Sequence, residues 1–285
     1  MGHSPRGAEF VGRSANVVYR LAQAPVVVRI RPWSAGEDLL GQVRSARQLA
    51  DSGAPVTRPL DVDQPVRVGR YVATFWEAAV LPSLEWQTAS LGHALRALHA
   101  APVPEHLPPW DPFATLVRRI SSVTHLDVAD RGWLSRETDR VEKAYRDVAQ
   151  TLRTSTIHGD AHVANVLRDP VGGPVLADLD SISIGPPLSD LVPTAVDGIR
   201  FRMRKRQRLM VDAYATDITQ HDAWPVLRRV RELGTTTFGL MVGIRSPRVD
   251  ALARHRLRTL QDDDGDARWH AYSSPLTVLS AEQEP

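Results

Sequence analysis

The 285-residue chain contains no cysteine. Disulfides, thiolate metal sites and thiol nucleophiles are therefore excluded from its chemistry. Lysine is almost as scarce, because only Lys143 and Lys205 occur among the 35 basic residues and all the others are arginines. No apolar run approaches the ~20 residues that a membrane-spanning helix needs, and the residues up to Val11 contain no apolar leader. The sequence therefore predicts a soluble, cytoplasmic protein without a membrane partner.

The formal net charge is only +2. Nucleic-acid binding needs a basic face together with a recognisable motif, and the sequence offers no such motif and no interleaving of aromatic and basic residues. We therefore predict no nucleic-acid partner. The 42% of hydrophobic residues can supply a sizeable core, either for one large domain or for two lobes that share a cleft.

The first part of the chain has short β-rich runs separated by turn residues. These runs cover residues 8–11, 16–21, 25–31 and 65–76, and they predict a small sheet. Between them, residues 37–50 place Leu39, Val43, Ala46 and Ala50 on one face, which predicts an amphipathic helix. The sequence changes character after residue 76.

From residue 84 onward, helical periods dominate the sequence. Apolar stripes with this spacing cover residues 84–98, 113–120, 196–214, 223–242 and 249–261. Two short apolar runs, 164–167 and 174–179, are joined by a turn sequence rich in glycine, which predicts a β-hairpin. The six basic residues of the segment 200–208 are interpreted as the solvated face of a helix. Together these patterns predict an α+β fold with a small β-rich N-terminal lobe and a mainly helical C-terminal lobe.

The residues with the clearest chemical pattern surround this hairpin. His158-Gly159-Asp160 is followed by Asn165, and Asp178 comes at the far end of the hairpin. Phosphoryl transfer needs a carboxylate that orients or deprotonates an acceptor hydroxyl, and oxygen ligands that hold Mg²⁺ on the phosphates. Asp160, Asn165 and Asp178 fit these needs, and their spacing allows them to face one cleft. The alternative interpretation is an ordinary capped loop with a polar turn.

Asp180 and the two histidines of the loop have less specific patterns. Asp180 follows Asp178 by two residues, which on a strand would place both carboxylates on one face. It is therefore a candidate second metal ligand, and the alternative is a polar residue at the rim of the site. His158 and His162 could form a zinc site with Asp160, but histidines in such a loop more often fix its geometry by hydrogen bonding.

The segment from His158 to Leu167, followed by Leu176-Ala177-Asp178-Leu179-Asp180, resembles the aminoglycoside phosphotransferase family. The fold of that family is similar to that of protein kinases, and its relatives include choline kinases and macrolide kinases. Further likeness lies at 12–20, 27–29, 53–56, 95–99 and 185–191, so the resemblance covers most of the chain. It implies a bilobal fold with a nucleotide-binding lobe, 1–76, and a catalytic and acceptor-binding lobe, 77–285.

The same resemblance implies ATP and Mg²⁺ as cofactors and assigns roles to particular residues. Asp160 would be the catalytic base, and Asn165 and Asp178 would be magnesium ligands. Ser14, Ala15 and Asn16 would lie over the phosphates, while Thr74, Phe75, Trp76 and Glu77 would form the hinge whose backbone meets adenine. Asp190 is expected to brace the catalytic loop, with His158 and His162 as further supporting residues. On sequence alone, the turn at 14–16 could also be a plain hairpin turn, although a small polar turn suits an anion.

Two positions depart from the pattern of the family. No lysine precedes Lys143, so the strand cation that contacts the phosphates would be Arg29, with Arg31 as the second candidate. Gln42 stands where the family places a helix glutamate that pairs with this cation. An amide can hydrogen-bond to Arg29 but cannot neutralise it.

The sequence predicts an ATP- and Mg²⁺-dependent phosphotransferase that acts on a hydroxyl group of a small molecule, either an aminoglycoside-like antibiotic or a metabolite. If the basic segment 200–208 borders the acceptor pocket, it disfavours a polycation and favours a neutral or anionic acceptor. Two alternatives stay open. One is a kinase-fold protein that binds nucleotide or a partner but transfers weakly or not at all, and the other is a glycosyltransferase that uses Asp178 and Asp180 as an acidic pair.

Overall fold

The computed structural model describes residues 4–13, 16–34 and 38–272. Its internal contacts divide the chain into two compact units. Of the described residues, those up to 108 and those in 155–184 form the first unit, and residues 109–154 and 185–272 form the second. The lobe boundary expected after residue 76 stays a prediction, because these units group residues by contact and not by lobe. In the described part of the chain, no helix combines the length and the apolar content that crossing a membrane would require.

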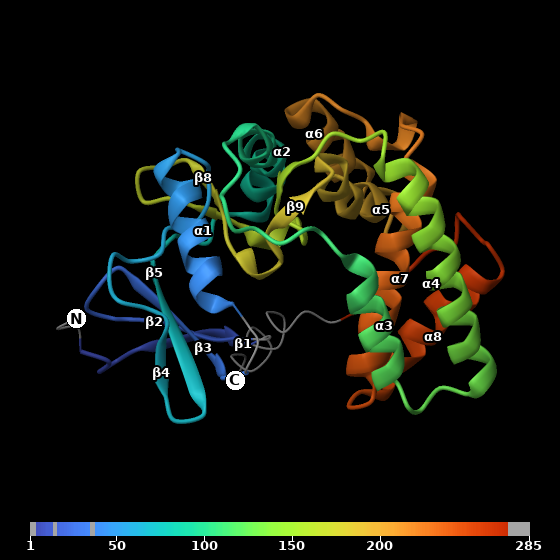
Figure 1. Ribbon diagram of the computed structural model, residues 1–285, viewed down its shortest axis with the longest axis horizontal. Helices are drawn as coiled ribbons and strands as arrows, with labels where there is room; N and C mark the ends of the chain where they lie inside the picture. The colour runs from blue at the N-terminus through green and yellow to red at the C-terminus, as the bar shows by residue number, and fades with distance from the viewer. Residues whose placement is uncertain (1–3, 14–15, 35–37, 273–285) are drawn as a thin grey trace, which may run out of the picture. The chain divides into compact units, whose positions relative to one another are not determined.

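An antiparallel five-stranded sheet forms the N-terminal part of the first unit, with the strand order β1-β2-β3-β5-β4 (Figure 1). Its strands are β1 (Glu9–Arg13), β2 (Val17–Arg20), β3 (Val26–Pro32), β4 (Val66–Val68) and β5 (Tyr71–Glu77). In β5, Val72, Thr74 and Trp76 are buried and alternate with more exposed residues. This period of two is that of a sheet with one covered face. The small sheet predicted from the β-rich runs is confirmed.

Helix α1 (Leu39–Asp51) follows β3 in the chain. It begins after Asp38, whose side chain accepts a hydrogen bond from the backbone N–H of Gly41. It ends before Gly53, whose φ of +82° belongs to the left-handed region that terminates many helices. The predicted helix is confirmed, although its first predicted residue, Glu37, lies outside the described residues. Its buried face includes Leu49 rather than the predicted Ala50, which is only half-buried.

The rest of the first unit contains helix α2 (Leu84–Ala100) and short strands that contact it. These strands are β6 (Ser155–Ile157), the hairpin of β7 (Val166–Arg168) and β8 (Pro174–Leu176), and β9 (Ser183–Gly185), which pairs with β6. The predicted hairpin is confirmed but is shorter than expected. It is shorter because the residues before β7 and after β8 form 3-10 turns, η1 (Val163–Asn165) and η2 (Leu179–Ser181).

The second unit is helical. Its elements are α3 (Pro112–Ser122), α4 (Val128–Ala149), the 3-10 turn η3 (Pro187–Asp190), α5 (Val192–Arg200), α6 (Arg204–Tyr214), η4 (Ile218–Gln220), α7 (Trp224–Gly243) and α8 (Pro247–Gln261). The helical stripe at 196–214 is interrupted between α5 and α6, where Arg202 has a φ of +60°. No apolar stripe was predicted for the segment that forms α4. The reason is that the helix buries only two aliphatic residues, Leu134 and Val141.

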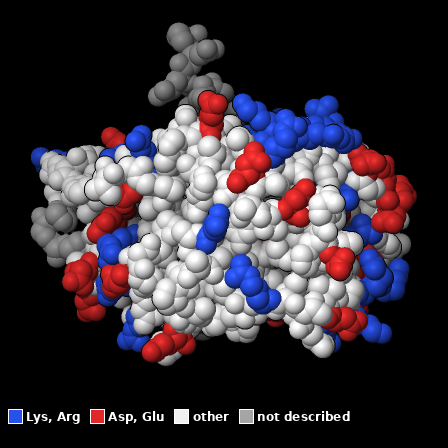
Figure 2. Space-filling model, turned by 90° about the horizontal axis from the view of Figure 1, so that it is seen from above, with Lys and Arg blue, Asp and Glu red and all other residues white. Residues whose placement is uncertain are grey.

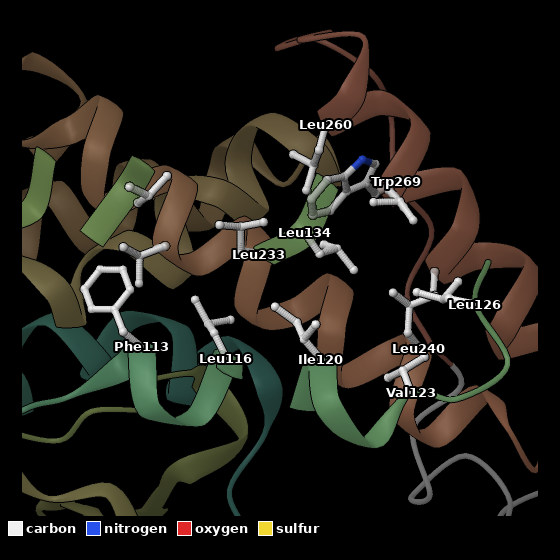
Figure 3. Packing of buried hydrophobic residues seen from close by; sticks show 14 residues of the cluster. Phe113, Leu116, Ile120, Val123, Leu126, Leu134, Leu233, Leu240, Leu260 and Trp269 are labelled. Carbon is white, nitrogen blue, oxygen red and sulfur yellow. The ribbon is translucent and has the colours of Figure 1, made fainter. Parts of the chain in front are cut away.

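Helices α3, α4, α7 and α8 enclose the core of the second unit (Figure 3). Phe113, Leu116 and Ile120 of α3 are buried in it, as the sequence predicted, whereas Val117 is exposed. Trp269 follows α8 and packs into the same core, and its Nε1–H donates to the hydroxyl of Thr259 at 3.0 Å. This bond satisfies the polar atom of an otherwise apolar side chain.

The basic segment 200–208 is not one solvated helix face, so that prediction is wrong for Arg200. This residue ends α5 with its side chain in the core, where only 1% of it is exposed. Its Nε donates to Glu232 Oε1 at 2.7 Å, and its guanidinium lies 4.6 Å from the centroid of the Trp269 ring. The prediction fails because the segment spans the end of one helix and the start of the next.

The remaining basic residues of this segment lie on α6 or just before it. Arg202, Arg204, Lys205 and Arg208 are exposed. Figure 2 views the molecule from above, the side on which α6 lies in Figure 1, and shows a dense gathering of Lys and Arg side chains there. For these residues the expected solvated face is confirmed.

We expect the Arg200–Glu232 pair to matter for folding. Removing one partner of a buried ion pair leaves the other charge without compensation, so Arg200→Ala should lower the free energy of unfolding by about 3 kcal/mol. Arg204→Ala removes the same side chain from an exposed position and should change that free energy by less than about 0.5 kcal/mol. Urea denaturation of the two variants measures the difference, and equal losses would contradict the structural role of Arg200.

Candidate active site

His158 connects the loop after β6 to the segment that leads to Asp178. The side chain of His158 is fully buried, and its Nε2 lies 2.8 Å from the carbonyl oxygen of Ala177. Its Nδ1 accepts the backbone N–H of Asp160 at 3.4 Å. The two contacts fit a neutral imidazole with its proton on Nε2, because one nitrogen donates while the other accepts. His158 is thus a bridge within the loop, with both ring nitrogens engaged by protein groups.

Gly159 is required by the geometry of the same loop. Its φ is +78°, a value that residues with a side chain rarely adopt. A Cβ at this position would also collide with the carbonyl oxygen of Ser181. The backbone of the loop 158–165 can therefore approach the η2 turn only if position 159 lacks a side chain.

Asp160 and Asn165 are joined across the loop. The side chain of Asp160 is 43% exposed, and its Oδ2 lies 3.8 Å from Nε2 of His162. Asn165 is buried, and its Nδ2 donates to the backbone carbonyl oxygen of Asp160 at 3.1 Å. Since the amide nitrogen is used in this way, the oxygen Oδ1 is the atom through which Asn165 can bind a cation. The carboxylate of Asp160 remains accessible to a substrate.

Asp178 and Asp180 do not lie on a strand, so the reason given for their shared orientation is wrong. Asp178 has a φ of +60°, and Asp180 lies in the η2 turn. The turn nevertheless brings both carboxylates to one guanidinium. Arg29 Nη2 is 2.6 Å from Asp178 Oδ1 and 3.0 Å from Asp180 Oδ1.

Two further side chains contact Asp180. Asn16, which is buried, donates from Nδ2 to Asp180 Oδ2 at 2.9 Å. Arg31 Nη1 lies 3.6 Å from the same oxygen, and Arg29 and Arg31 share one face of β3 because they are two residues apart. Sequence reasoning missed these contacts, although the spacing of two residues between Arg29 and Arg31 indicated that both side chains lie on one face of the strand. Ser14 and Ala15, the other residues expected over the phosphates, lie outside the described residues.

The carboxylates, not Gln42, are the partners of Arg29. Gln42 lines the same small cavity as Arg29, but it makes no side-chain hydrogen bond in the described part of the chain. The expected bond from this amide to Arg29 is therefore absent from the residues that the structure describes. The positive charge of Arg29 is compensated by Asp178 and Asp180.

The cavity around these side chains is nearly filled. Its volume is about 20 Å³, and it is lined by Asn16, Arg29, Arg31, Leu39, Gln42, Val43, Val72, Thr74, Trp76, Leu179 and Asp180. Such a volume holds roughly one water molecule. The side chains that line the cavity are therefore closely packed.

The backbone groups expected to meet adenine already have partners. The N–H of Phe75 donates to Gln64 Oε1 at 2.7 Å, and the N–H of Glu77 donates to the carbonyl of Arg58 at 2.9 Å. On the other edge of β5, Thr74 and Trp76 pair with β3. A purine could therefore use residues 74–77 only by displacing strand partners.

The oxygen ligands fit magnesium better than zinc. In the described part of the chain, no three His, Asp or Glu side chains come together as a metal site. Mg²⁺ is commonly held by one or two protein oxygens, with phosphates and water completing its shell, whereas a structural zinc site needs four protein ligands. Asn165 Oδ1 and the second oxygen of Asp178 suit the first arrangement.

Asp190 is buried in the η3 turn, with 1% of its surface exposed. It belongs to the second compact unit, whereas Asp160 and Asn165 belong to the first. Its expected role in bracing the catalytic loop stays a prediction.

Comparison with known proteins decides the family of the chain. Residues 8–233 match the model of the phosphotransferase enzyme family. The chain belongs to this family. Its members are small-molecule phosphotransferases, and this chain is accordingly a kinase that phosphorylates an alcohol group of a small molecule. No curated protein matches the chain in sequence.

Solved structures confirm the predicted bilobal, protein-kinase-like fold of this family. A choline/ethanolamine kinase family protein from Mesorhizobium loti is 21% identical, with a TM-score of 0.64, and the match covers 90% of this chain and 88% of that one. An aminoglycoside phosphotransferase from Streptomyces rimosus is 18% identical, with a TM-score of 0.59 and coverages of 81% and 93%. A spectinomycin phosphotransferase in complex with ADP and spectinomycin is 14% identical, with a TM-score of 0.58 and coverages of 90% and 90%.

The close approach at Gly159 gives a testable consequence. Gly159→Ala should be strained by its φ and by the contact with Ser181, so we expect a loss of about 2 kcal/mol in the free energy of unfolding. Gly173→Ala, in the β-hairpin turn where a Cβ meets nothing within 4 Å, serves as the control. Thermal and urea denaturation compare the two. Equal stability of the variants would show that the loop does not depend on this contact.

Proposed function

We propose that this chain transfers the γ-phosphoryl group of ATP, in the presence of Mg²⁺, to a hydroxyl group of a small molecule. The observation that carries the proposal is the loop 158–165, in which Asp160 has an accessible carboxylate and the amide nitrogen of Asn165 donates to the Asp160 backbone, so that its oxygen is the atom that could bind a cation. Asp178 adds a carboxylate from the segment that His158 ties to this loop. These are the residue types that phosphoryl transfer requires.

Asp160 is the proposed catalytic base. Its carboxylate accepts the proton of the acceptor hydroxyl while the acceptor oxygen forms a bond to the γ-phosphorus and the bond to the leaving ADP breaks. His162, 3.8 Å from Asp160 Oδ2, can orient this carboxylate. Asn165 and Asp178 would hold Mg²⁺, which when bound neutralises the charge that develops on the phosphate oxygens.

Arg29 is the proposed cation for the nucleotide phosphates. A guanidinium binds phosphate through two parallel N–H groups, so it can replace a lysine ammonium with a different geometry. Asn16 and the adjoining Ser14 and Ala15 would lie over the phosphates. Residues 74–77, whose backbone groups pair within the sheet, are the proposed hinge that meets the purine.

The second candidate is a protein that binds nucleotide but transfers its phosphate poorly. It is favoured by one observation, namely that Arg29 contacts the proposed metal ligand Asp178 and leaves a cavity of only about 20 Å³. A transferase must open these contacts in each cycle. The two candidates differ in turnover but share nucleotide binding.

Turnover by the unmodified chain separates the two candidates, and substitution of Asp160 tests the proposed base. We expect turnover of ATP with a responsive acceptor, and Asp160→Asn should reduce kcat by about a hundredfold to ten-thousandfold, because the amide cannot accept the proton. The acceptor panel should include aminoglycosides, choline, neutral sugars and anionic hydroxy acids. Asp169→Asn, in the hairpin turn, is the matched control. Unchanged turnover in Asp160→Asn would reject the assignment of Asp160 as the base.

Nucleotide binding can be tested without an acceptor. A ligand that binds only the folded state stabilises it by about 2.7 kcal/mol at a hundred times its dissociation constant, so ATP with Mg²⁺ should raise the Tm of the protein. In Asp178→Asn, the extra stabilisation that Mg²⁺ adds to that of ATP alone should disappear. Differential scanning fluorimetry with ATP, with and without Mg²⁺, gives this comparison. No Tm rise at millimolar nucleotide would contradict both candidate functions.

A further inference from the structure

We propose that Asp180 is a positioning residue that holds Arg29 and Arg31 ready for the nucleotide phosphates, and that it is not a ligand of the metal. The proposal rests on the proposed function of this site as a nucleotide-binding one. It changes the role of a residue that its spacing from Asp178 had made a candidate metal ligand.

The contacts of the two carboxylates differ. Both oxygens of Asp180 are engaged, Oδ1 by Arg29 at 3.0 Å and Oδ2 by Asn16 at 2.9 Å and Arg31 at 3.6 Å. Asp178 contacts Arg29 through Oδ1, and its side chain is 44% exposed compared with 29% for Asp180. Asp178 therefore keeps an accessible oxygen for a cation, whereas Asp180 is enclosed by donors.

Charge explains why a carboxylate is needed at this point. Arg29 and Arg31 project from the same face of β3, and their side chains are each only 13% exposed. Two guanidinium groups held this close repel each other unless an acid lies between them. Among the described residues that line the cavity, Asp180 is the only acid, and the facing helix α1 contributes Leu39, Gln42 and Val43.

Asp180 also connects the arginines to Asn16, the residue directly before β2. The bond from Asn16 Nδ2 brings the start of this strand to the same carboxylate. Three segments that would surround the phosphates are thus fixed through one side chain. Groups that are already ordered lose less conformational entropy when a ligand binds, so this arrangement favours phosphate binding by preorganisation.

The affinity for ADP, measured by calorimetry with and without Mg²⁺, distinguishes positioning from metal ligation. In Asp180→Asn, we expect the dissociation constant of ADP to rise about tenfold in both conditions, because Arg29 and Arg31 are then no longer held in place for the phosphates. The dissociation constant of ADP without Mg²⁺, divided by that with Mg²⁺, should stay within about twofold of the same ratio in the unmodified chain. In Asp178→Asn, that ratio should collapse towards one, because the benefit of Mg²⁺ is lost.

A coupling measurement tests the contact itself. If Asp180 acts by holding Arg31, then Arg31→Gln should weaken ADP binding. The double variant, with Asp180→Asn and Arg31→Gln, should then bind ADP about as tightly as the single variant that binds it less well. Asp63→Asn, at an exposed position in the same unit, controls for the loss of one acidic charge and should leave ADP binding unchanged.

Two results would overturn the assignment of Asp180. One is a Mg²⁺ ratio that collapses in Asp180→Asn as it does in Asp178→Asn, which would make Asp180 a metal ligand. The other is fold-changes of Asp180→Asn and Arg31→Gln that simply multiply in the double variant. A different outcome, in which the unmodified chain binds no ADP in either condition, would reject the proposed function and not only the role of Asp180.

Discussion

The ion cluster of Arg29, Asp178 and Asp180 is the interaction on which the first unit depends. It joins the strand β3 to the η2 turn, which comes about 150 residues later in the sequence, and it does so in a cavity with room for one water molecule. The side chain of Arg29 is only 13% exposed, so its charge requires the carboxylates as partners, whereas Asp178 is 44% exposed. If nucleotide binds at this site as proposed, its phosphates meet guanidinium groups that the carboxylates already hold in place.

The use of arginine has consequences for the neighbouring residues. A guanidinium is planar and presents several donors in fixed directions, so one side chain can contact two carboxylates at once. Arg29 does this, and the position of α1 that faces it needs no acid of its own. The amide at Gln42 is therefore compatible with a charged strand, because compensation comes from the turn after β8.

Local patterns in the sequence predicted much of this fold. The β-rich run 65–76 corresponds to β4 and β5, and the stripe at Leu84, Leu91, Leu95 and Leu98 corresponds to α2, although Leu84 is exposed. The loop 158–165 was recognisable because Gly159, Asp160 and Asn165 occur at short, characteristic spacings in the sequence. Contacts between distant segments were not predictable in this way. The sequence around Asp180 does not indicate that Asn16 bonds to it. Likewise, the sequence around Arg200 does not indicate that Glu232 forms an ion pair with it.

The strand assumed for Asp178 and Asp180 shows the limit of periodicity. Alternation assigns faces only if the backbone stays extended, and Asp178 leaves that region with a φ of +60°. The positive φ shortens the strand and starts the η2 turn. The same turn presents the Ser181 carbonyl that excludes a side chain at Gly159. The backbone conformation at Asp178 and the glycine at 159 are therefore required by the same close approach.

The hydrogen bonds at Phe75 also protect the sheet from other chains. Beyond β4, the outer edge of β5 would expose unpaired backbone groups, and such an edge is a template for a strand from another molecule. The side-chain amide of Gln64 occupies this place, since it accepts the N–H of Phe75 at 2.7 Å and donates to its carbonyl at 3.2 Å. The backbone of residues 58–60 also bonds to Phe75 and Glu77, so Gln64 and this segment together cover the edge of β5 and leave less of it open to another strand.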